Sequence, residues 1–437
     1  MDVPAIAILS LRYASWFFFA LLLFGGVFRL AELASASSKV RKYAHSLHTV
    51  DYRRFQDSEH IMPVSLILPA TEETEPLTNC VKNLLSLEFR QYELIVVADS
   101  RNETSWLSLC EGYNLLPFRQ PYKKTLKSGE IEGVYRSAKD VRLVVLDQRG
   151  GSRADALNAG VNVSSYPIVA TVYPRQRLTK NALLKTVYAF VGDSACLYIG
   201  SFPRVGVVDV AAPKKQAALA EYQAIERLRL LYTHPLGHRE LGVYLPAQTA
   251  FAAFLKSAVL EEGGFSGKTK AEQADLLLRM HARHRKGKNA YCARLLPDAI
   301  CYEAPKESMR AVCTDRGRAQ RAMNGALRRN RRLPKQRSGL AYTRLAETGW
   351  PLAQLLGFAA VLAAAILGAA SYWFLLFYLL LGALLGALQS AGAVLLEENA
   401  FQLTTDTGLL LRRYLLAVIE NFGYRQRVAF ARLFVRR

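Results

Sequence analysis

The sequence has few cysteines, the residues that build disulfide-rich domains and many zinc-binding domains. The chain has 437 residues but only six cysteines, and no two of them form a CxxC pair. This spacing gives no zinc-finger or redox-dithiol signature, and we expect reduced thiols. The sequence also has no internal repeat and no low-complexity linker, which excludes a solenoid built from repeated units.

Acidic residues are too few to balance the basic ones. The chain has 36 Asp and Glu against 57 Lys and Arg, a formal net charge of +21. A surplus of this size needs an anionic partner or surface. The densest basic cluster directly precedes a long apolar stretch, and its members are Arg316, Arg318, Arg321, Arg328, Arg329, Arg331, Arg332, Lys335 and Arg337. That position favours anionic lipid headgroups, so we expect membrane lipids as partners and no nucleic acid.

Three long apolar runs account for much of the 51% hydrophobic content. They cover Tyr13 to Leu33, Trp350 to Ala370 and Tyr372 to Leu396. Each reaches the ~20 residues that a helix needs to cross a bilayer. Helices of a soluble core seldom stay apolar on every face over such a length. We therefore predict an amino-terminal transmembrane helix within residues 1–38 and a transmembrane hairpin within residues 350–396.

The basic residues around the first run predict its orientation. Only Arg12 precedes the run, which argues against a cleaved signal, whereas several cations follow it: Lys39, Arg41, Lys42, Arg53 and Arg54. The positive-inside bias then places the amino terminus outside and residue 39 onward in the cytoplasm. The hairpin crosses the membrane twice and returns to the cytoplasmic side, so the tail is expected to be cytoplasmic as well. We expect a multi-pass protein with its main domain in the cytoplasm.

The carboxyl-terminal segment, residues 400–437, allows two interpretations. Between Gly408 and Tyr424, apolar residues alternate with charged ones. This pattern is typical of an amphipathic helix at the membrane surface. A fourth span interrupted by Arg412 and Arg413 is the alternative, and both remain open from the sequence.

Residues 62–300 read as alternating strands and helices. Buried strands are predicted at 64–69, 93–99, 142–146 and 167–172, with a helix at 77–85. Such alternation predicts an α/β fold, a mostly parallel sheet with helices on both faces. Ligands of such sheets lie at the carboxyl ends of the strands, which here are followed by Ala70 to Glu72, Asp99 and Tyr173 to Arg175. Residues 301–345 should form basic helices at the membrane surface.

Four segments of this region resemble the membrane-bound family 2 glycosyltransferases, the family of cellulose, hyaluronan and poly-N-acetylglucosamine synthases. They are Val64 to Glu73, Ile95 to Ser100, Gly150 to Gly160 and Glu261 to Phe265. The second is similar to Val-Asp-Asp-Gly-Ser, with Asp99 at the second aspartate. The third is similar to Gly-Lys-x-x-Ala-Leu-Asn-x-Gly, with Arg153 at the lysine. The resemblance implies a GT-A-like nucleotide-sugar domain in a bacterial inner-membrane protein.

The resemblance also implies which residues contact the nucleotide. Ala70 and Glu72 follow the opening strand, in the loop that surrounds uracil in the family. Asp99 is expected at uracil, and Arg153 at the phosphates. Arg175 is the fifth residue implied, because an arginine pairs directly with phosphate oxygens. A nucleotide-sugar is therefore a possible partner.

The sequence departs from the family where the metal is held. The family keeps an Asp-x-Asp motif whose carboxylates bind Mg²⁺ or Mn²⁺ against the diphosphate. At that place this chain has Tyr173, Pro174 and Arg175. Hard divalent cations need oxygen ligands, and a guanidinium supplies none. We therefore predict no metal ligands and no cofactor.

The catalytic base and the acceptor site depart from the family too. The aspartate of the family's Thr-Glu-Asp motif, its general base, is Gln273 here, and a glutamine cannot accept a proton from a sugar hydroxyl. Glu272 is the candidate substitute for the base. In the Gln-x-x-Arg-Trp helix Arg321 is kept, as an acceptor or phosphate contact, but the tryptophan is Ala322.

Two functional hypotheses follow. In the first, the chain is catalytically impaired and acts as a subunit or regulator of polysaccharide or glycolipid assembly, alongside other proteins of that system. In the second, it is an active, metal-independent glycosyltransferase that moves a sugar from a nucleotide-sugar to a polysaccharide or lipid acceptor. In that case Arg153, Arg175 and Arg321 replace the metal.

Overall fold

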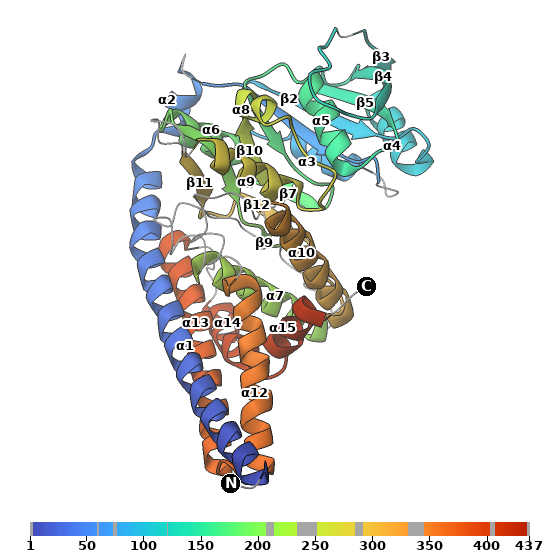
Figure 1. Cartoon of the computed structure of the whole chain (residues 1–437). Helices are drawn as coiled ribbons and strands as arrows, with labels where there is room; N and C mark the ends of the chain where they lie inside the picture. Colours follow the sequence, from blue (N-terminus) through green and yellow to red (C-terminus); the bar gives the residue numbers. More distant parts are fainter. Residues whose placement is uncertain are drawn as a thin grey trace.

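The molecule has an α/β domain at one end and a bundle of long apolar helices at the other (Figure 1). The computed structural model describes residues 3–58, 61–72, 77–119, 121–206, 214–233, 251–284, 292–330, 345–402 and 407–434. Four of the predicted basic residues, Arg331, Arg332, Lys335 and Arg337, lie outside these described residues.

A nine-stranded sheet forms the centre of the described α/β domain, in the order β11-β8-β10-β6-β1-β2-β5-β4-β3. Its strands are β1 (Val64–Pro69), β2 (Tyr92–Ala98), β3 (Leu115–Pro117), β4 (Glu130–Ser137), β5 (Leu143–Arg149), β6 (Ile168–Thr171), β8 (Cys196–Ser201), β10 (Phe251–Leu255) and β11 (Cys292–Leu296). The central strands β6, β1, β2 and β5 are parallel. By contrast, β10 is antiparallel to both its neighbours, and β3 and β4 form an antiparallel edge. The predicted parallel centre is confirmed, and antiparallel strands extend it.

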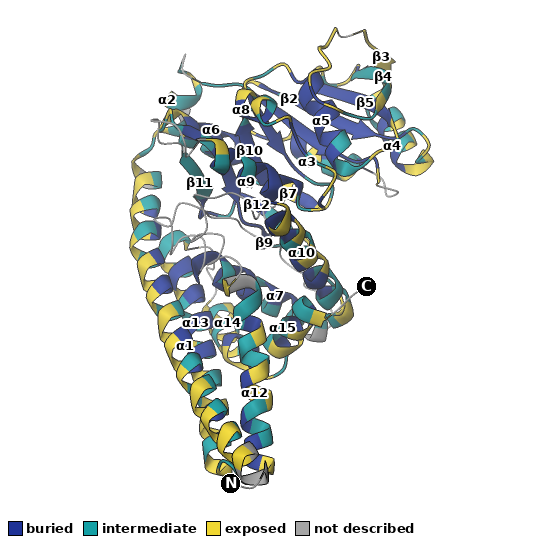
Figure 2. Ribbon diagram, in the orientation of Figure 1, coloured by how far each residue is buried: buried dark blue, intermediate teal, exposed yellow. Residues whose placement is uncertain are grey.

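Helices cover both faces of this sheet, because successive residues of a strand point to opposite sides. On one face, Leu66 and Leu68 of β1 pack with side chains from α3 (Thr78–Leu85), α4 (Glu103–Tyr113) and α6 (Ala182–Val191). On the other face, Ile67 packs in a cluster with α5 (Arg153–Val163), α8 (Lys256–Glu261), α9 (Glu272–His284) and α10 (Met309–Arg329). Figure 2 shows the central strands as buried throughout. The predicted α/β fold is confirmed.

A second, three-stranded sheet lies beside the carboxyl ends of the central strands. It consists of β7 (Gln176–Leu178), β12 (Cys301–Glu303) and β9 (Arg204–Val205), in that order. Since β12 belongs to the α/β domain, this domain extends to Glu303, slightly beyond the boundary at residue 300 expected from the sequence. The short helix α2 (Tyr52–Gln56) connects the domain to the amino-terminal helix.

Three apolar helices pack together below the domain: α1 (Val3–Thr49), α12 (Trp350–Ile366) and α13 (Tyr372–Phe401). Helices α1 and α13 are long and apolar enough to cross a membrane, whereas α12 has 17 residues. Only 28% and 39% of the most apolar stretches of α1 and α13 are buried, so these are not helices of a soluble core. Figure 2 shows much of their surface exposed at the end far from the domain.

Glycines let these helices approach closely, as small residues do in membrane bundles. A Cβ atom at Gly392 of α13 would lie 2.6 Å from the Leu33 side chain of α1, and one at Gly357 of α12 would lie 2.5 Å from Tyr378 of α13. The Trp16 and Phe374 rings pack at 5.0 Å near the far end. The amino terminus and the turn between α12 and α13 therefore lie at the same end (Figure 1).

A layer of shorter helices separates the domain from the apolar bundle (Figure 1). It contains α7 (Lys214–Thr233), α14 (Thr407–Ile419) and α15 (Tyr424–Phe434), with the far end of α10, and the π-helical turn η3 (Leu345–Gly349) leads into α12. Helices α14 and α15 have 13 and 11 residues, which is too short to cross a bilayer. The described tail therefore favours the surface-helix interpretation over a fourth span.

Buried ion pairs connect this layer and the domain to the bundle. Arg204 donates to both carboxylate oxygens of Glu397 of α13 at 2.9 Å, and Tyr232 of α7 bonds to the same carboxylate. Arg316 of α10 is 2% exposed and pairs with Glu226 of α7 at 3.0 Å. Arg316 therefore does not face lipid, contrary to the expectation for the basic cluster.

Candidate functional site

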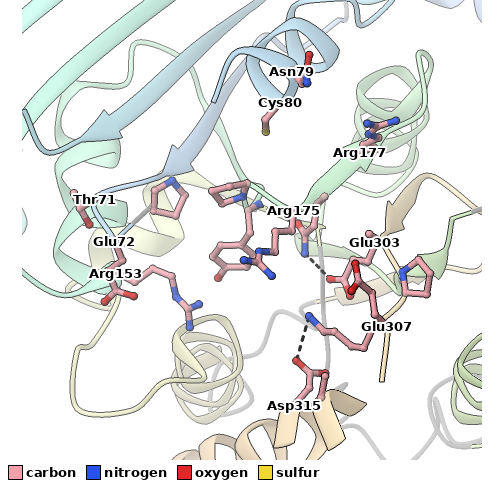
Figure 3. Close-up of a pocket in the computed structure, with 18 of the residues that line it drawn as sticks. Thr71, Glu72, Asn79, Cys80, Arg153, Arg175, Arg177, Glu303, Glu307 and Asp315 are labelled. Atoms are coloured by element: carbon pink, nitrogen blue, oxygen red, sulfur yellow. Dashed lines mark hydrogen bonds and ion pairs between the residues drawn. The ribbon is translucent and has the colours of Figure 1, made fainter. Parts of the chain in front are cut away.

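A cavity of about 860 Å³ opens at the carboxyl ends of β1 and β6 (Figure 3). The three-stranded sheet and the start of α10 form its opposite wall. Its lining includes polar and charged side chains from several elements: Thr71, Glu72, Arg153, Tyr173, Arg175, Arg177, Glu303, Lys306, Glu307 and Asp315. The cavity lies at the edge of the sheet where the sequence places ligand-binding residues.

Three of the predicted nucleotide-binding residues, Glu72, Arg153 and Arg175, line this cavity. Figure 3 shows Arg175 in its middle, with Glu72 and Arg153 on one side and Glu303 and Glu307 on the other. Ala70 is buried at the end of β1, where its N–H donates to Val97 O, next to the lining residue Thr71.

The structure does not bring the other two predicted contact residues into the cavity. Asp99 follows β2 and is absent from the lining, although its carboxylate accepts the Gly150 N–H just ahead of α5. Arg321 is exposed on α10 and does not line the cavity either.

Arg153, the first residue of α5, contacts two predicted site residues at once. Its Nε and Nη2 atoms donate to the two carboxylate oxygens of Glu272 at 3.2 and 2.9 Å. Its guanidinium carbon lies 4.9 Å from the ring centroid of Tyr173. Burial raises the pKa of Tyr173, with Glu272 adding to the effect. The Tyr173 phenol is therefore neutral, and the Glu272 carboxylate already has a cation as its partner.

Gln273 and Asp275 hold α9 against the rest of the domain. The Gln273 amide donates to Thr171 Oγ1 at 2.6 Å, and Thr171 in turn donates to the carbonyl of Ala252 in β10. Asp275 is fully buried and accepts from Arg279 at 3.0 Å, Arg329 at 3.1 Å and Asn330 at 2.9 Å. Both side chains have structural partners, and neither lines the cavity.

Asp99 is held by its neighbour Arg101. Arg101 Nε and Nη2 donate to the two Asp99 oxygens at 2.9 and 2.5 Å. These bonds, together with the N–H groups of Gly150 and Arg101, hold the pKa of Asp99 well below its usual range, although burial opposes the shift. The carboxylate is therefore charged but engaged, and it braces the turn before α5.

Two cations of the cavity have no signal in the sequence patterns. Arg177 comes from β7, and Lys306 from the loop between β12 and α10, where its Nζ lies 3.7 Å from Asp315 Oδ1. Beside them, Glu303 of β12 accepts from Gln176 at 2.9 Å and from Arg227 at 3.2 Å. These residues join the cavity only because β7 and β12 pair, which no local pattern predicts.

The best-kept motifs of the family resemblance have structural roles. Asn158 of α5 accepts the Phe265 N–H at 2.8 Å and donates to the carbonyls of Phe265 and Lys127. Gly264 has a φ of +76°, and a Cβ there would lie 2.5 Å from Asn158 Oδ1. This glycine turn and α5 therefore fit together as one unit. The chain keeps these scaffold residues and departs from the family at the site.

The residues beside Tyr173 do not fit a divalent cation. Among the described residues, no group of three or more His, Cys, Asp or Glu side chains is arranged to hold a metal. Two other aspartates near the motif have protein partners: Asp155 caps α5 through Ser152, and Asp147 accepts the Ser100 N–H. A buried phenol and two guanidinium groups stand where a hard cation needs several oxygen ligands.

Comparison with known proteins agrees with the sequence resemblance. The chain is 20% identical over 256 residues to poly-beta-1,6-N-acetyl-D-glucosamine synthases of Staphylococcus aureus strains, such as COL and N315, covering 58% of this chain and 53% of the relative. It thus spans about half the length of the curated relatives it matches. No protein-family model matches. The chain is similar to family 2 glycosyltransferases. Its α/β domain has the mostly parallel sheet with helices on both faces that the resemblance implies.

Solved structures with a similar arrangement include two nucleotide-sugar complexes. One is the mannosyltransferase PcManGT from Pyrobaculum calidifontis with GDP-Man and Mn²⁺, at 16% identity, a TM-score of 0.48 and coverage of 91% of this chain and 99% of that one. The other is TarS 1–349 of S. aureus with UDP-GlcNAc, at 14% identity, a TM-score of 0.39 and coverage of 78% and 90%.

Proposed function

We propose that this chain is a membrane-embedded, glycosyltransferase-like protein that binds a nucleotide-sugar but transfers no sugar. It acts as a subunit or regulator of polysaccharide or glycolipid assembly. One observation carries the proposal: the acidic side chains at the base position are all engaged. Glu272 is paired with Arg153, Asp275 is bound by two arginines, and the residue at the position of the family's base is Gln273.

A general base must be within reach of the hydroxyl it deprotonates and must have a lone pair to offer. The Gln273 amide has no basic atom, and its N–H is used by Thr171. Asp275 is fully buried. Only Glu272 touches a cavity residue, and both of its oxygens accept from Arg153. Among the described residues, the base position at 272–275 therefore offers no unengaged carboxylate.

Binding of a diphosphate is supported by the cations of the cavity. Arg153, Arg175 and Arg177 line it together with Lys306. Guanidinium groups form strong, paired hydrogen bonds to phosphate oxygens without a metal. The poly-N-acetylglucosamine synthases similar to this chain are polymer-forming enzymes by name, which supports an activated sugar as the ligand.

The location proposed is the inner membrane of a bacterium, with several spans and the α/β domain in the cytoplasm. Exposed apolar surface on α1 and α13 supports insertion. The basic residues that follow the first apolar run support a cytoplasmic domain.

Active, metal-independent transfer is the second candidate, and the position of Arg153 favours it. A bound diphosphate would compete with Glu272 for this guanidinium. If Arg153 turned to the phosphates, the Glu272 carboxylate would be released at the edge of the cavity and become available as a base.

Calorimetry and a transfer assay on the detergent-purified full chain separate the two. We expect UDP-GlcNAc or GDP-mannose to bind equally well with Mn²⁺ and with EDTA, and no labelled product to form. Arg175→Gln should weaken binding about tenfold, the loss of one charge-assisted contact, whereas Arg90→Gln, an exposed arginine at the opposite end of β2, should not. Product formation by the unmodified chain, abolished by Glu272→Gln, would establish the second candidate. Failure of both nucleotides to bind would refute the proposal.

A further inference from the structure

A second, smaller cavity lies between α1, α7, α12 and α15. Its volume is about 60 Å³, and its lining shares no residue with the nucleotide cavity. Four arginines, one from α1, one from α7 and two from α15, face this small space together with the indole of Trp350: Arg29, Arg229, Arg425 and Arg432. The carboxylate in the lining is Glu226.

The two carboxylates near this cavity, those of Glu226 and Glu420, already accept hydrogen bonds from other side chains. Glu226 accepts from Arg432 at 3.3 Å, but it also accepts from Arg316 at 3.0 Å. Glu420 bonds to Arg229 and to Ser390. Glu226 therefore serves two arginines, whereas Glu420 bonds to one arginine and keeps one buried oxygen without a hydrogen-bond partner among the described residues.

Arg425 is the cation left without an acidic partner. Among the described residues, it donates only to two neutral amide oxygens, of Asn421 at 3.1 Å and of Gln389 at 3.3 Å. Burial lowers the pKa of Arg425 well below its ordinary value, and the nearby Arg229 lowers it further. The charge of Glu420 opposes this shift in part, but within the described part of the chain it forms no hydrogen bond to Arg425, and a guanidinium shielded from water gains from an anion that bonds to it directly.

A second polar group in the lining of this cavity also lacks a partner among the described residues. The Trp350 Nε1–H is buried and has no acceptor in the described part of the chain. Arg29 lies over the same indole, 5.2 Å from its centroid. A buried N–H that faces a cavity lined by cations is suited to an anionic oxygen acceptor. The cavity has room for about two waters at ~30 Å³ each, which suits a single phosphate group and excludes a nucleotide.

The cavity lies where the apolar surface of the bundle begins. On α1, Phe28 precedes Arg29 and is 40% exposed; on α12, Leu352 and Leu356 follow Trp350 and are 39% and 50% exposed. An anion that approaches the arginines past these apolar residues comes from the side that faces lipid. Such an anion should therefore have a hydrocarbon chain attached. We propose that this arginine cavity binds the phosphate headgroup of an anionic membrane lipid. The proposal rests on membrane insertion of the bundle, but it does not depend on nucleotide binding.

Thermal unfolding and native mass spectrometry of the full chain in neutral detergent test this site. The probes are dioleoyl phosphatidic acid, dioleoyl phosphatidylcholine and inorganic phosphate. We expect phosphatidic acid to raise the unfolding temperature and to remain bound, and the other two to do neither. Arg425→Gln should weaken phosphatidic acid binding about 10- to 100-fold, as expected for losing a charge-assisted bond. Arg427→Gln, an exposed arginine on the same helix, should leave it unchanged.

Lipid-free stability separates a ligand site from a structural role. Because Arg425 has no acidic partner, Arg425→Gln without lipid should unfold at the same temperature as the unmodified chain or above it. If Arg425→Gln does not fold, Trp350→Phe replaces it, since this change removes an N–H that has no acceptor in the described part of the chain; it should weaken lipid binding several-fold. The proposal is wrong if phosphatidylcholine or inorganic phosphate stabilises as well as phosphatidic acid, or if Trp350→Phe and Arg427→Gln bind it equally.

Discussion

At the scale of single residues, Arg153 decides what the nucleotide cavity can do. Its guanidinium is paired with Glu272 and lies against the ring of Tyr173. The side chain of Arg153 is 37% exposed, whereas that of Glu272 is 6% exposed. The cation therefore reaches the cavity while the carboxylate stays behind it. Under the proposed function, Arg153 is the residue of this pair that meets a phosphate group, and Glu272 is shielded from a sugar hydroxyl.

Removing the charge of Glu272 should strengthen nucleotide binding. In Glu272→Gln the guanidinium of Arg153 loses its competing carboxylate, so more of its interaction goes to the diphosphate. We expect the affinity for UDP to rise about three- to tenfold, as for a partly exposed ion pair worth ~1 kcal/mol. Calorimetry with UDP measures this, with Glu262→Gln on the same face of the domain as control. A fall in affinity would show that Glu272 itself contacts the nucleotide.

Cys292 should be the most reactive thiol at low pH. It pairs in register with Cys196 of β8, and hydrogen bonding with that thiol lowers the pKa of Cys292 to about 6, with help from Arg294 against the effect of burial. The thiolate is the nucleophile, so iodoacetamide labelling of Cys292 should rise as pH passes through about 6. Burial raises the pKa of Cys110, which serves as the control in peptide mass spectrometry. Parallel pH profiles for the two would contradict the paired thiols.

At the scale of elements, helix α5 is fixed by contacts on both of its sides. Gly160 lets it approach β1, since a Cβ there would lie 2.5 Å from Ile67. Ser152 and Asp155 cap its first turn reciprocally. Asn158 then connects it to the turn at Gly264. This fixed helix presents Arg153 from its first residue to the cavity.

Replacing Asn158 should lower the stability of the domain without changing the reactive groups of the site. Asn158→Ala removes three buried hydrogen bonds, which at ~1 kcal/mol each lowers the free energy of unfolding by about 3 kcal/mol. The unfolding temperature should fall measurably in differential scanning fluorimetry. Asn181→Ala, at an exposed position with no capping bond to its helix, should change it little. Equal effects of both changes would mean that the turn is held by other contacts.

At the scale of the whole molecule, the helices between domain and bundle make the chain one unit. Ile225 and Leu228 of α7 pack with Leu33 of α1 and Ala393 of α13 in one buried cluster. Buried pairs such as Arg204 with Glu397 reinforce the contact. These contacts fix the distance between the proposed nucleotide cavity and the apolar helices.

Reporter fusions test the proposed topology. Because the turn between α12 and α13 lies at the end of the bundle far from the domain, a reporter inserted after residue 371 should be external. One fused after residue 437 should be cytoplasmic. Alkaline phosphatase and fluorescent-protein fusions measure the two locations in opposite ways. An external carboxyl terminus would overturn the orientation derived from the basic residues.

Local sequence patterns predict the parallel centre of the sheet, the apolar helices and the departures from the family, but not the outer strands β3, β4, β8, β10 and β11. Local patterns suffice for the parallel centre: runs such as 64–69 and 93–99 are apolar throughout because parallel strands are buried on both faces, and β1 and β2 form where predicted. The replacement of carboxylates by Tyr173, Arg175 and Gln273 is likewise visible in the sequence alone.

Only the tertiary structure decided which side chains meet. Arg177 and Lys306 reach the cavity through the pairing of β7 with β12, which are more than a hundred residues apart. Helix α7 lies within the predicted domain by sequence, yet it packs against the long apolar helices α1 and α13. Whether Glu272 is an available base or the partner of Arg153 depends on a contact between residues 119 positions apart. Periodicity and local motifs record which face of an element is buried, but not which distant element covers that face.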